Sequence, residues 1–126
     1  MSVVGRRGAA RTGDCFNSAC PSRRILAHVT GRWGPLVLAA LRERDVMRFS
    51  ELRDRIDGIS EKMLAQTLRD LECDRLLVRT SRPVVPPYVD YRLTPLGAGA
   101  AERVDGLVRW VENNMDAFGV SVSRGS

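Results

Sequence analysis

The 126-residue sequence contains one histidine, one lysine and three cysteines, which is a poor supply of metal ligands and catalytic bases. Cys15 and Cys20 are five residues apart, so the cysteines and His28 do not have the spacing of a zinc site. His28 has apolar neighbours on a predicted helix, where a hydrogen-bonded core histidine is the expected outcome. The sequence also has no Gly-rich phosphate loop, no Ser/His/Asp set and no paired carboxylates on expected loops. We therefore predict a protein that is not an enzyme and has neither a metal nor another cofactor.

Long apolar runs are missing as well. No stretch approaches the roughly 18 consecutive apolar residues that a membrane helix needs. Residues 1–14 contain arginines without an apolar segment after them, which is unlike a secretory signal. An odd number of cysteines without an export signal favours free thiols in a reducing compartment. We expect a cytoplasmic protein that does not enter a membrane.

The positive charge of the chain is almost entirely arginine. The net charge is +5, the isoelectric point is about 9.8, and Lys62 is the only lysine. Arginine can grip phosphate groups or guanine edges with two donors at once, so a small basic domain favours nucleic acid or an acidic surface as its partner. The length suits one domain with a modest core, and 44% apolar content is ordinary for a globular protein.

Residues 49–77 have the pattern of two helices joined by a tight turn at 57–59. Apolar residues recur at helical spacing in both halves: Phe49, Leu52 and Ile56, then Leu64, Leu68 and Leu71. Ser60 is placed to cap the second helix, because its hydroxyl can accept a hydrogen bond from a backbone N–H of the first turn.

The face of this second helix opposite its leucines is polar and cationic. It carries Lys62, Gln66, Arg69 and Cys73. A short helix, a glycine-containing turn and a second helix with such a face are typical of a helix-turn-helix, whose second helix contacts DNA. On this stretch alone, an ordinary helical hairpin with a solvated face is the alternative.

Two further helices are predicted before this stretch. The first opens at residues 20–22 and runs to about residue 29, with an apolar edge at Ile25 and Val29. The second runs from 36 to 41 with Pro35 at its first position. Its continuous apolar run predicts the most buried helix of the domain.

A small β-ribbon is predicted after the helix-turn-helix. Residues 77–81 and 89–93 alternate as strands do, and the segment 82–88 between them holds three prolines that cannot donate ladder hydrogen bonds. A two-stranded ribbon in this position is the wing of a winged helix. It is flanked by Arg79, Arg82 and Arg92. A further strand of two or three residues is expected at 47–49.

The last predicted helix begins with Thr94 as its cap and Pro95 in its first turn and runs to about residue 114. Its apolar stripe consists of Leu96, Ala100, Val104, Leu107, Val108 and Val111. Such a helix is longer than a small domain needs, so we expect its apolar face to find a partner. The predicted organisation is a flexible basic tail at 1–18, a winged helix-turn-helix DNA-binding domain at 19–116 and a frayed C-terminus at 117–126. The tail either contacts phosphates or only aids solubility.

Several short motifs occur in a characteristic order. They are Gly31-Arg32-Trp33, residues 48–52, Gly58-Ile59-Ser60, residues 68–72 and Val85-Pro86-Pro87. In this combination the chain resembles the HxlR-type winged-helix transcriptional regulators, a bacterial group related to the MarR regulators. The resemblance covers about residues 20–115. It implies a mainly α fold with a small β-wing, dimerising through the first and last helices.

The resemblance also implies a function. A homodimeric DNA-binding regulator would bind a palindromic operator with the helix at 60–74 in the major groove and the wing at 78–93. Carried over residue by residue, the DNA-binding positions are Ser60, Glu61, Lys62, Gln66 and Arg69 on the helix, and Arg82 and 85–88, including Tyr88, on the wing. Gln66 suits adenine and Arg69 or Lys62 suits guanine. Glu61 either serves the helix dipole or accepts from cytosine. The alternative function is a winged-helix adaptor that binds proteins without sequence-specific DNA binding.

The chain departs from the family pattern at two positions. Arg75 stands where the family often has glycine after the recognition helix, so a left-handed backbone there would be strained. Tyr88 stands at the predicted wing tip, where a basic residue is frequent in the family. We therefore expect the stem residues Arg82 and Arg92 to supply the phosphate contact instead.

Cys20, just before a proline, matches a family position whose thiol senses oxidants or electrophiles in some members. A helix N-terminus and the neighbouring Arg23 and Arg24 would stabilise its thiolate, whereas the alternative role is a small buried hydrophobe. Cys73 is either a resolving thiol or merely tolerated at a helix end, and Cys15 has the reach to pair with either. An oxidant or a small electrophile is therefore the candidate effector.

Overall fold

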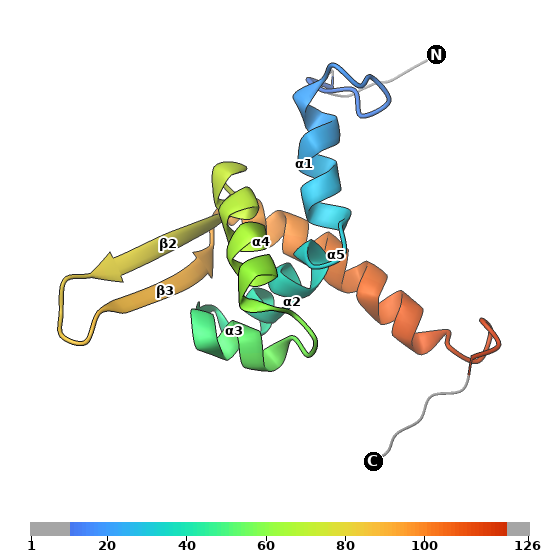
Figure 1. Cartoon of the computed structure of the whole chain (residues 1–126). Helices are drawn as coiled ribbons and strands as arrows, with labels where there is room; N and C mark the ends of the chain where they lie inside the picture. Colours follow the sequence, from blue (N-terminus) through green and yellow to red (C-terminus); the bar gives the residue numbers. More distant parts are fainter. Residues whose placement is uncertain (1–10, 121–126) are drawn as a thin grey trace.

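The computed structural model describes residues 11–120, so the predicted tail up to residue 10 and the C-terminal residues 121–126 lie outside the described part. The described elements are α1 (Pro21–Thr30), α2 (Gly34–Arg44), β1 (Val46–Arg48), α3 (Phe49–Arg55), α4 (Glu61–Cys73), β2 (Leu77–Arg82), β3 (Tyr88–Leu93) and α5 (Pro95–Asn113). Figure 1 shows the helices packed around α2, with the β2–β3 ribbon projecting to one side. This is the winged helix-turn-helix with a small β-wing that the sequence predicts.

The helix α2 lies at the centre of the core. Val37, Leu38 and Leu41 are fully buried, which confirms the prediction of the most buried helix. The helix is longer than predicted, because residues 42–44 continue it as an exposed last turn whose two arginines suit the negative end of the helix dipole. Asp45 then ends it with φ of 67°, a positive value that is uncommon for residues other than glycine and less so for aspartate.

The helices α3 and α4 form the predicted helix-turn-helix. Both helices contribute leucines to the core: α3 contributes Leu52, and α4 contributes Leu64, Leu68 and Leu71. Ser60 caps α4, since its hydroxyl accepts a hydrogen bond from the backbone N–H of Met63 at 3.1 Å. Gly58 in the turn has φ of 88°, which glycine adopts without steric cost. The local features recognised in the sequence therefore do produce this motif.

The three described strands form an antiparallel sheet in the order β1-β3-β2. Its inner face carries Met47, Leu77 and Tyr91, which are buried. The first strand is Val46–Arg48 rather than the predicted 47–49, because residue 49 already begins α3. Both wing strands are one residue longer than predicted, since Arg82 pairs with Tyr88 and the three prolines stay in the loop beyond that pair.

The helix α5 begins as predicted. The Thr94 hydroxyl accepts a hydrogen bond from the backbone N–H of Gly97 at 2.9 Å and so caps the helix. A Cβ at position 97 would lie 1.7 Å from the carbonyl oxygen of Leu76, so only glycine lets the helix approach the start of β2 this closely.

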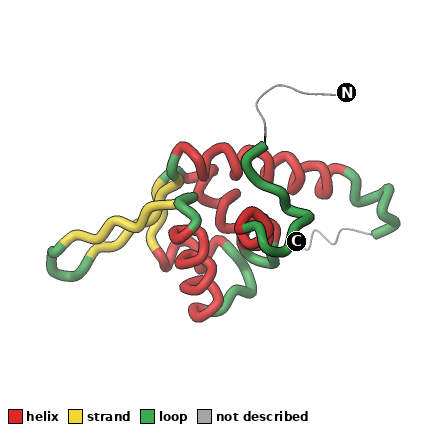
Figure 2. Tube along the Cα trace, turned by 90° about the horizontal axis from the view of Figure 1, so that it is seen from above, coloured by secondary structure: helices red, strands yellow, loops and turns green. Residues whose placement is uncertain are grey.

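The predicted apolar stripe of α5 is not one continuous buried face. Its members that are buried or packed against the core are Ala100, Val104 and Val108. Its exposed members are Leu96, Leu107 and Val111. The cause is that Leu96 lies in the exposed first turn and that the last turns of α5 extend beyond the helices on which it packs, as Figures 1 and 2 show. Phe118 then packs edge-on against Trp110, with 5.5 Å between the ring centroids.

Candidate nucleic-acid interface

The exposed face of α4 brings together four of the predicted residues. They are Lys62, Gln66, Arg69 and Cys73. The leucines three or four positions away are at most 2% exposed, so burial follows the helical period and turns these polar side chains outward. The α4 face therefore has the donors of a DNA-contacting helix and a backbone held by the core.

The first turn of α4 is engaged within the protein. The Ser60 hydroxyl is the helix cap, and Oε2 of Glu61 lies 2.6 Å from Nη1 of Arg53 on α3. Glu61 also stands at the positive end of the helix dipole. Of its two predicted roles, stabilisation of the helix fits this geometry better, because the carboxylate already has a cationic partner.

The side chains that suit base recognition are linked to one another. Nε2 of Gln66 donates to Oδ1 of Asp70 at 2.9 Å, and Nη2 of Arg69 donates to Oε1 of Gln66 at 3.1 Å. In these two bonds, Nε2 of the Gln66 amide is the donor and Oε1 is the acceptor. A glutamine has two donors and two acceptor lone pairs, so one of each remains for a base. Asp70 was absent from the predicted set, although its spacing of four from Gln66 on a helix was a usable signal.

His28 lies between α1 and α4 rather than within the core. Its side chain is 24% exposed, and Nδ1 lies 2.5 Å from Oδ2 of Asp74, whose side chain is only 2% exposed. Nε2 lies 4.0 Å from Oδ2 of Asp70. The expectation of a hydrogen-bonded histidine is thus confirmed, but its surroundings are two carboxylates and not apolar side chains.

The wing places Tyr88 differently from the prediction. It is the first residue of β3 and not the tip, because it pairs with Arg82 across the ribbon. The guanidinium carbon of Arg82 lies 5.1 Å from the centroid of the Tyr88 ring, and that of Arg48 lies 4.7 Å from the same centroid. The loop beyond carries the exposed Val84 and Val85 instead.

Strand alternation puts the predicted wing residues on one face of the sheet. Residues opposite each other in an antiparallel pair point to the same side, so Arg82, Tyr88 and Arg92 share a face with Arg48. Arg79 lies on the other face, paired with Tyr91. Arg48 was absent from the predicted set, because nothing in its local sequence indicates that β1 pairs with β3.

Arg75 has the backbone conformation that was expected to be strained. Its φ is 64°, and it follows α4 in a Schellman arrangement, in which the backbone N–H of Leu76 donates to the carbonyl of Leu71 at 2.9 Å. Its own carbonyl accepts a hydrogen bond from the Thr94 hydroxyl at 2.7 Å. A non-glycine residue therefore occupies a left-handed position between α4 and β2.

Cys20 occupies the N-cap position of α1 and is half-buried. Its Sγ accepts hydrogen bonds from the backbone N–H of Asp14 at 3.4 Å and from the Ser22 hydroxyl at 3.0 Å. The Asp14 bond has the largest effect, followed by the hydroxyl and the backbone N–H of Ser22, and together they lower the pKa of the Cys20 thiol. The N-terminus of α1, which was one of the two predicted causes of a lowered thiol pKa, therefore does contribute.

The arginines do not contribute as predicted. The guanidinium of Arg23 donates to the carbonyl oxygens of Cys15 and Phe16, at 3.1 and 3.5 Å, and so holds the preceding loop rather than the thiol. Cys15 is half-buried in that loop. Cys73 is exposed on α4, as its position opposite the leucines implied.

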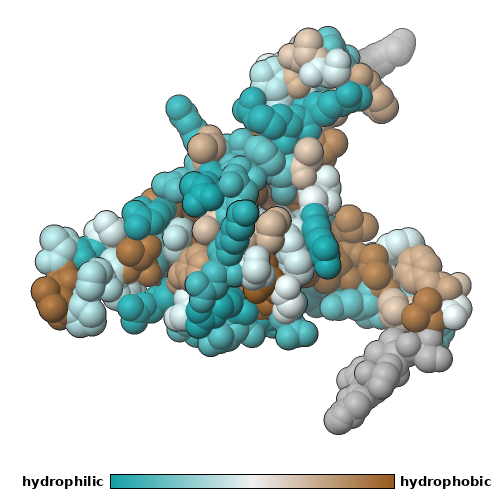
Figure 3. All heavy atoms as spheres, viewed as in Figure 1, coloured by the Kyte–Doolittle hydropathy of each residue, from teal (hydrophilic) through white to brown (hydrophobic). Residues whose placement is uncertain are grey.

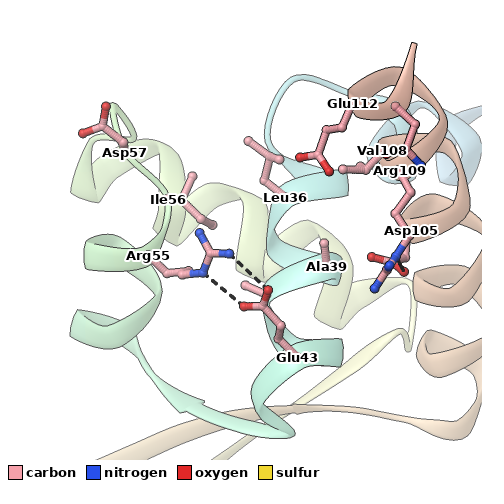
Figure 4. Close-up of a pocket in the computed structure, with 12 residues that line it drawn as sticks. Leu36, Ala39, Glu43, Arg55, Ile56, Asp57, Asp105, Val108, Arg109 and Glu112 are labelled. Atoms are coloured by element: carbon pink, nitrogen blue, oxygen red, sulfur yellow. Dashed lines mark hydrogen bonds and ion pairs between the residues drawn. The ribbon is translucent and has the colours of Figure 1, made fainter. Parts of the chain in front are cut away.

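A cavity of about 520 Å³ opens between α2, α3 and α5 (Figure 4). Its apolar wall includes Leu36 and Val108, and four of the charged side chains that line it form two ion pairs, Glu43 with Arg55 and Asp105 with Arg109. Arg55 donates twice to Glu43, both at 3.1 Å, which lowers the pKa of that carboxyl. Asp105 accepts from Arg42 at 2.9 Å and from Arg109 at 2.7 Å.

Neither a metal-ligand cluster nor a membrane-spanning helix is found among the described residues 11–120. No group of three or more His, Cys, Asp or Glu side chains there is arranged to hold a metal ion. No described helix is long and apolar enough to cross a membrane.

The fold and the α4 face are matched by a family model. The HxlR-like helix-turn-helix model covers residues 28–118, which is most of the described chain. The chain belongs to the HxlR-like helix-turn-helix family. Its relatives are named as HTH-type transcriptional regulators, and this chain is likewise a transcriptional regulator with a helix-turn-helix DNA-binding fold.

Individual relatives and solved structures agree with this assignment. The uncharacterized HTH-type transcriptional regulator YtfH of Escherichia coli K12 is 52% identical over 115 residues, covering 91% of this chain and 90% of YtfH. The structure of the ytfH regulator of Salmonella typhimurium superposes with a TM-score of 0.79 at 52% identity, over 84% of this chain and 94% of that one. The reduced form of the redox regulator HypR has a TM-score of 0.69 at 30% identity, over 79% and 97% of the two chains.

Proposed function

We propose that this HxlR-type protein is a homodimeric bacterial regulator that inserts α4 into the major groove of a palindromic operator and places its wing along the backbone. The observation that carries the proposal is the α4 face, where polar side chains project from a helix whose leucines are fully buried. The base-contacting residues would be Lys62, Gln66 and Arg69 on α4. The wing residues Arg82, Tyr88 and Arg92 would lie along the DNA backbone. Ser60 and Glu61 would act mainly by holding the first turn of α4.

The dimer is supported by apolar surface on α5 and α1. Leu107 is 58% and Trp110 is 55% exposed, and Leu26 on α1 is 47% exposed. Figure 3 shows hydrophobic side chains gathered over the last turns of α5. A monomer rarely leaves large apolar side chains grouped on its surface, so a second copy is the expected occupant. We infer that α1 and α5 of two copies form the interface.

A response to oxidants is the finer part of the proposal. Cys20 has a lowered thiol pKa and is only half-buried, which are the conditions for thiolate reactivity. Two of the similar structures are named as the redox regulator HypR and as diamide-treated YodB from B. subtilis, the latter at 28% identity and a TM-score of 0.62. Cys73, exposed on α4, is the candidate resolving thiol. An oxidant or electrophile would then be the effector, acting in the cytoplasm.

Binding-site sequencing on genomic DNA, with reduced and oxidised protein compared, tests this function. The expected result is a set of palindromic sites whose occupancy falls or changes on oxidation. A gel shift at two salt concentrations separates the alternative, a protein-binding adaptor. Sequence-specific binding that weakens with salt supports the regulator, whereas no preference among duplexes at either salt concentration supports the adaptor.

A further inference from the structure

Three side chains form a stack at the end of the β2–β3 ribbon that adjoins the wing loop. Tyr88 lies on β3, the central strand of the sheet, while Arg48 comes from β1 on one side and Arg82 from β2 on the other. Both guanidinium carbons lie within about 5 Å of the ring centroid, at 4.7 and 5.1 Å. This is the distance of a cation–π contact, in which the flat face of the guanidinium meets the ring.

The two guanidiniums have unused donors. Among the residues that the structure describes, neither Arg48 nor Arg82 forms a salt bridge. By contrast, two arginines of α3 are neutralised, Arg53 by Glu61 and Arg55 by Glu43. Stacking occupies the face of a guanidinium and leaves the N–H groups at its edge directed outward in the plane, where they can donate to an anion.

A buried carboxylate lies beside the stack. Asp90 is 1% exposed, and its Oδ1 has no hydrogen-bond partner within the described residues. It is the direct partner of Arg48 in the β1–β3 register, so the two side chains leave the same face of the sheet. A carboxylate in such a poorly solvated position attracts nearby cations strongly. Asp90 therefore favours keeping Arg48 against the sheet beside Tyr88 rather than extended into solvent.

We propose that Arg48 and Arg82 form a phosphate-binding site for the DNA backbone and that Tyr88 is the residue that positions both. This inference rests on the proposed DNA binding. Arg48 immediately precedes α3, so the site joins the helix-turn-helix to the wing through one aromatic ring. Holding two long side chains in place before binding lowers the conformational entropy that binding costs. Tyr88 was expected to leave the wing tip without a phosphate contact. In this arrangement it would instead strengthen a phosphate contact made by Arg48 and Arg82.

The test measures binding to a duplex of unrelated sequence by fluorescence anisotropy over a series of salt concentrations. The slope of log affinity against log salt falls by about 0.9 for each phosphate that the protein no longer neutralises. We expect Arg48→Ala and Arg82→Ala each to reduce the slope by about that amount. Tyr88→Leu should reduce it although no charge is removed, and Tyr88→Phe, which keeps the ring, should bind as the parent does.

The matched control is Arg103→Ala, which removes one exposed arginine of α5 that donates to the carbonyl of Gly99. Its slope should equal that of the parent. Combining Tyr88→Leu with the two arginine changes should add nothing further, because the ring acts only through them. Thermal melting checks that each variant folds. Should Tyr88→Leu unfold, the side-chain N–H signals of Arg48 and Arg82 in NMR spectra of the parent protein provide the second measurement, since both should shift on addition of the duplex.

The outcomes separate the two levels of the proposal. If the parent protein binds the duplex and Arg48→Ala has the same salt slope as the control Arg103→Ala, the phosphate site is wrong. The DNA-binding function would still stand in that case. Equal slopes for Tyr88→Leu and Tyr88→Phe overturn the positioning role of the ring. A parent protein that binds no duplex even at low salt overturns both the site and the proposed function.

Discussion

Nδ1 of His28 lies 2.5 Å from Oδ2 of Asp74, and this contact fastens α1 to the C-terminal end of α4. The same histidine lies 4.0 Å from Asp70, which holds the amide of Gln66. His28 therefore joins the helix that begins after Cys20 to α4, with Asp74 at hydrogen-bond distance and Asp70 farther away. Displacement of α1 would be felt at α4 through these contacts.

His28→Ala should destabilise the domain by about 1–3 kcal/mol, because it leaves the nearly buried Asp74 carboxylate without its partner. Urea denaturation followed by circular dichroism measures this. Arg24→Ala, an exposed change on the same helix, is the control and should have little effect. Equal stabilities of the two variants would contradict the role given to the contact.

Gln66→Ala and Arg69→Ala should each lower affinity for the operator by about 1–3 kcal/mol and relax the sequence preference. Affinity for random DNA should fall less. Competition binding with operator and scrambled duplexes measures the difference, with the exposed Glu72→Ala on the same helix as the control. If both variants discriminate operator from scrambled DNA as the parent does, α4 does not make the base contacts.

Leu107→Glu should convert the protein to a monomer and weaken operator binding at the same time. The substitution puts a charge among the exposed apolar side chains of the last turns of α5, where a partner would have to desolvate it. Light scattering at micromolar concentration measures the molecular mass of the protein in solution. Arg103→Glu adds a carboxylate to an exposed position on the same helix and should leave the mass unchanged. A parent protein that scatters as a monomer would refute the dimer.

The Cys20 thiol should react with iodoacetamide faster at neutral pH than a free cysteine, whose pKa is about 8.5. Because the hydrogen bonds to Sγ lower the pKa, the rate should rise with pH through a midpoint below that of a free thiol. Ser22→Ala removes the second-largest cause, so its midpoint should move upward. A midpoint that is unchanged by Ser22→Ala would show that the hydroxyl does not stabilise the thiolate.

Cys20→Ser should keep operator binding and lose the response to diamide. Cys73→Ser should lose only the disulfide, if Cys73 is the resolving thiol, and keep an initial response to electrophiles. Gel shifts with and without diamide compare the three proteins. If diamide releases DNA equally from the parent and from Cys20→Ser, the effector acts elsewhere.

Arg75→Gly should stabilise the domain by roughly 0.5–1 kcal/mol, because glycine adopts a φ of 64° without the steric cost that arginine has. Gly58→Ala is the matched opposite change. Its φ is 88° and a Cβ there would meet no atom within 4 Å, so any loss of stability comes from the backbone alone. Thermal melting should show the two variants shifting in opposite directions.

Local patterns in the sequence determined most of the helical architecture. The leucines of α4, the Ser60 cap and the Thr94–Pro95 start of α5 could all be predicted, because helical period and capping depend on residues within four or five positions of one another. The same local logic identified the polar face of α4, whereas the left-handed position of Arg75 came from comparison with the family pattern. The motifs of the chain also sufficed for its family.

Only the tertiary structure decided which distant side chains meet. Cys20 accepts from Asp14, only six residues away, because the irregular loop before α1 folds back on the thiol. Tyr88 contacts Arg48 because β1 pairs with β3, and His28 meets Asp74 because α1 packs on α4. Such encounters depend on strand register and helix packing between segments separated by many residues, which periodicity does not specify. The wing stack, one of the features most closely tied to the proposed function, is of this kind.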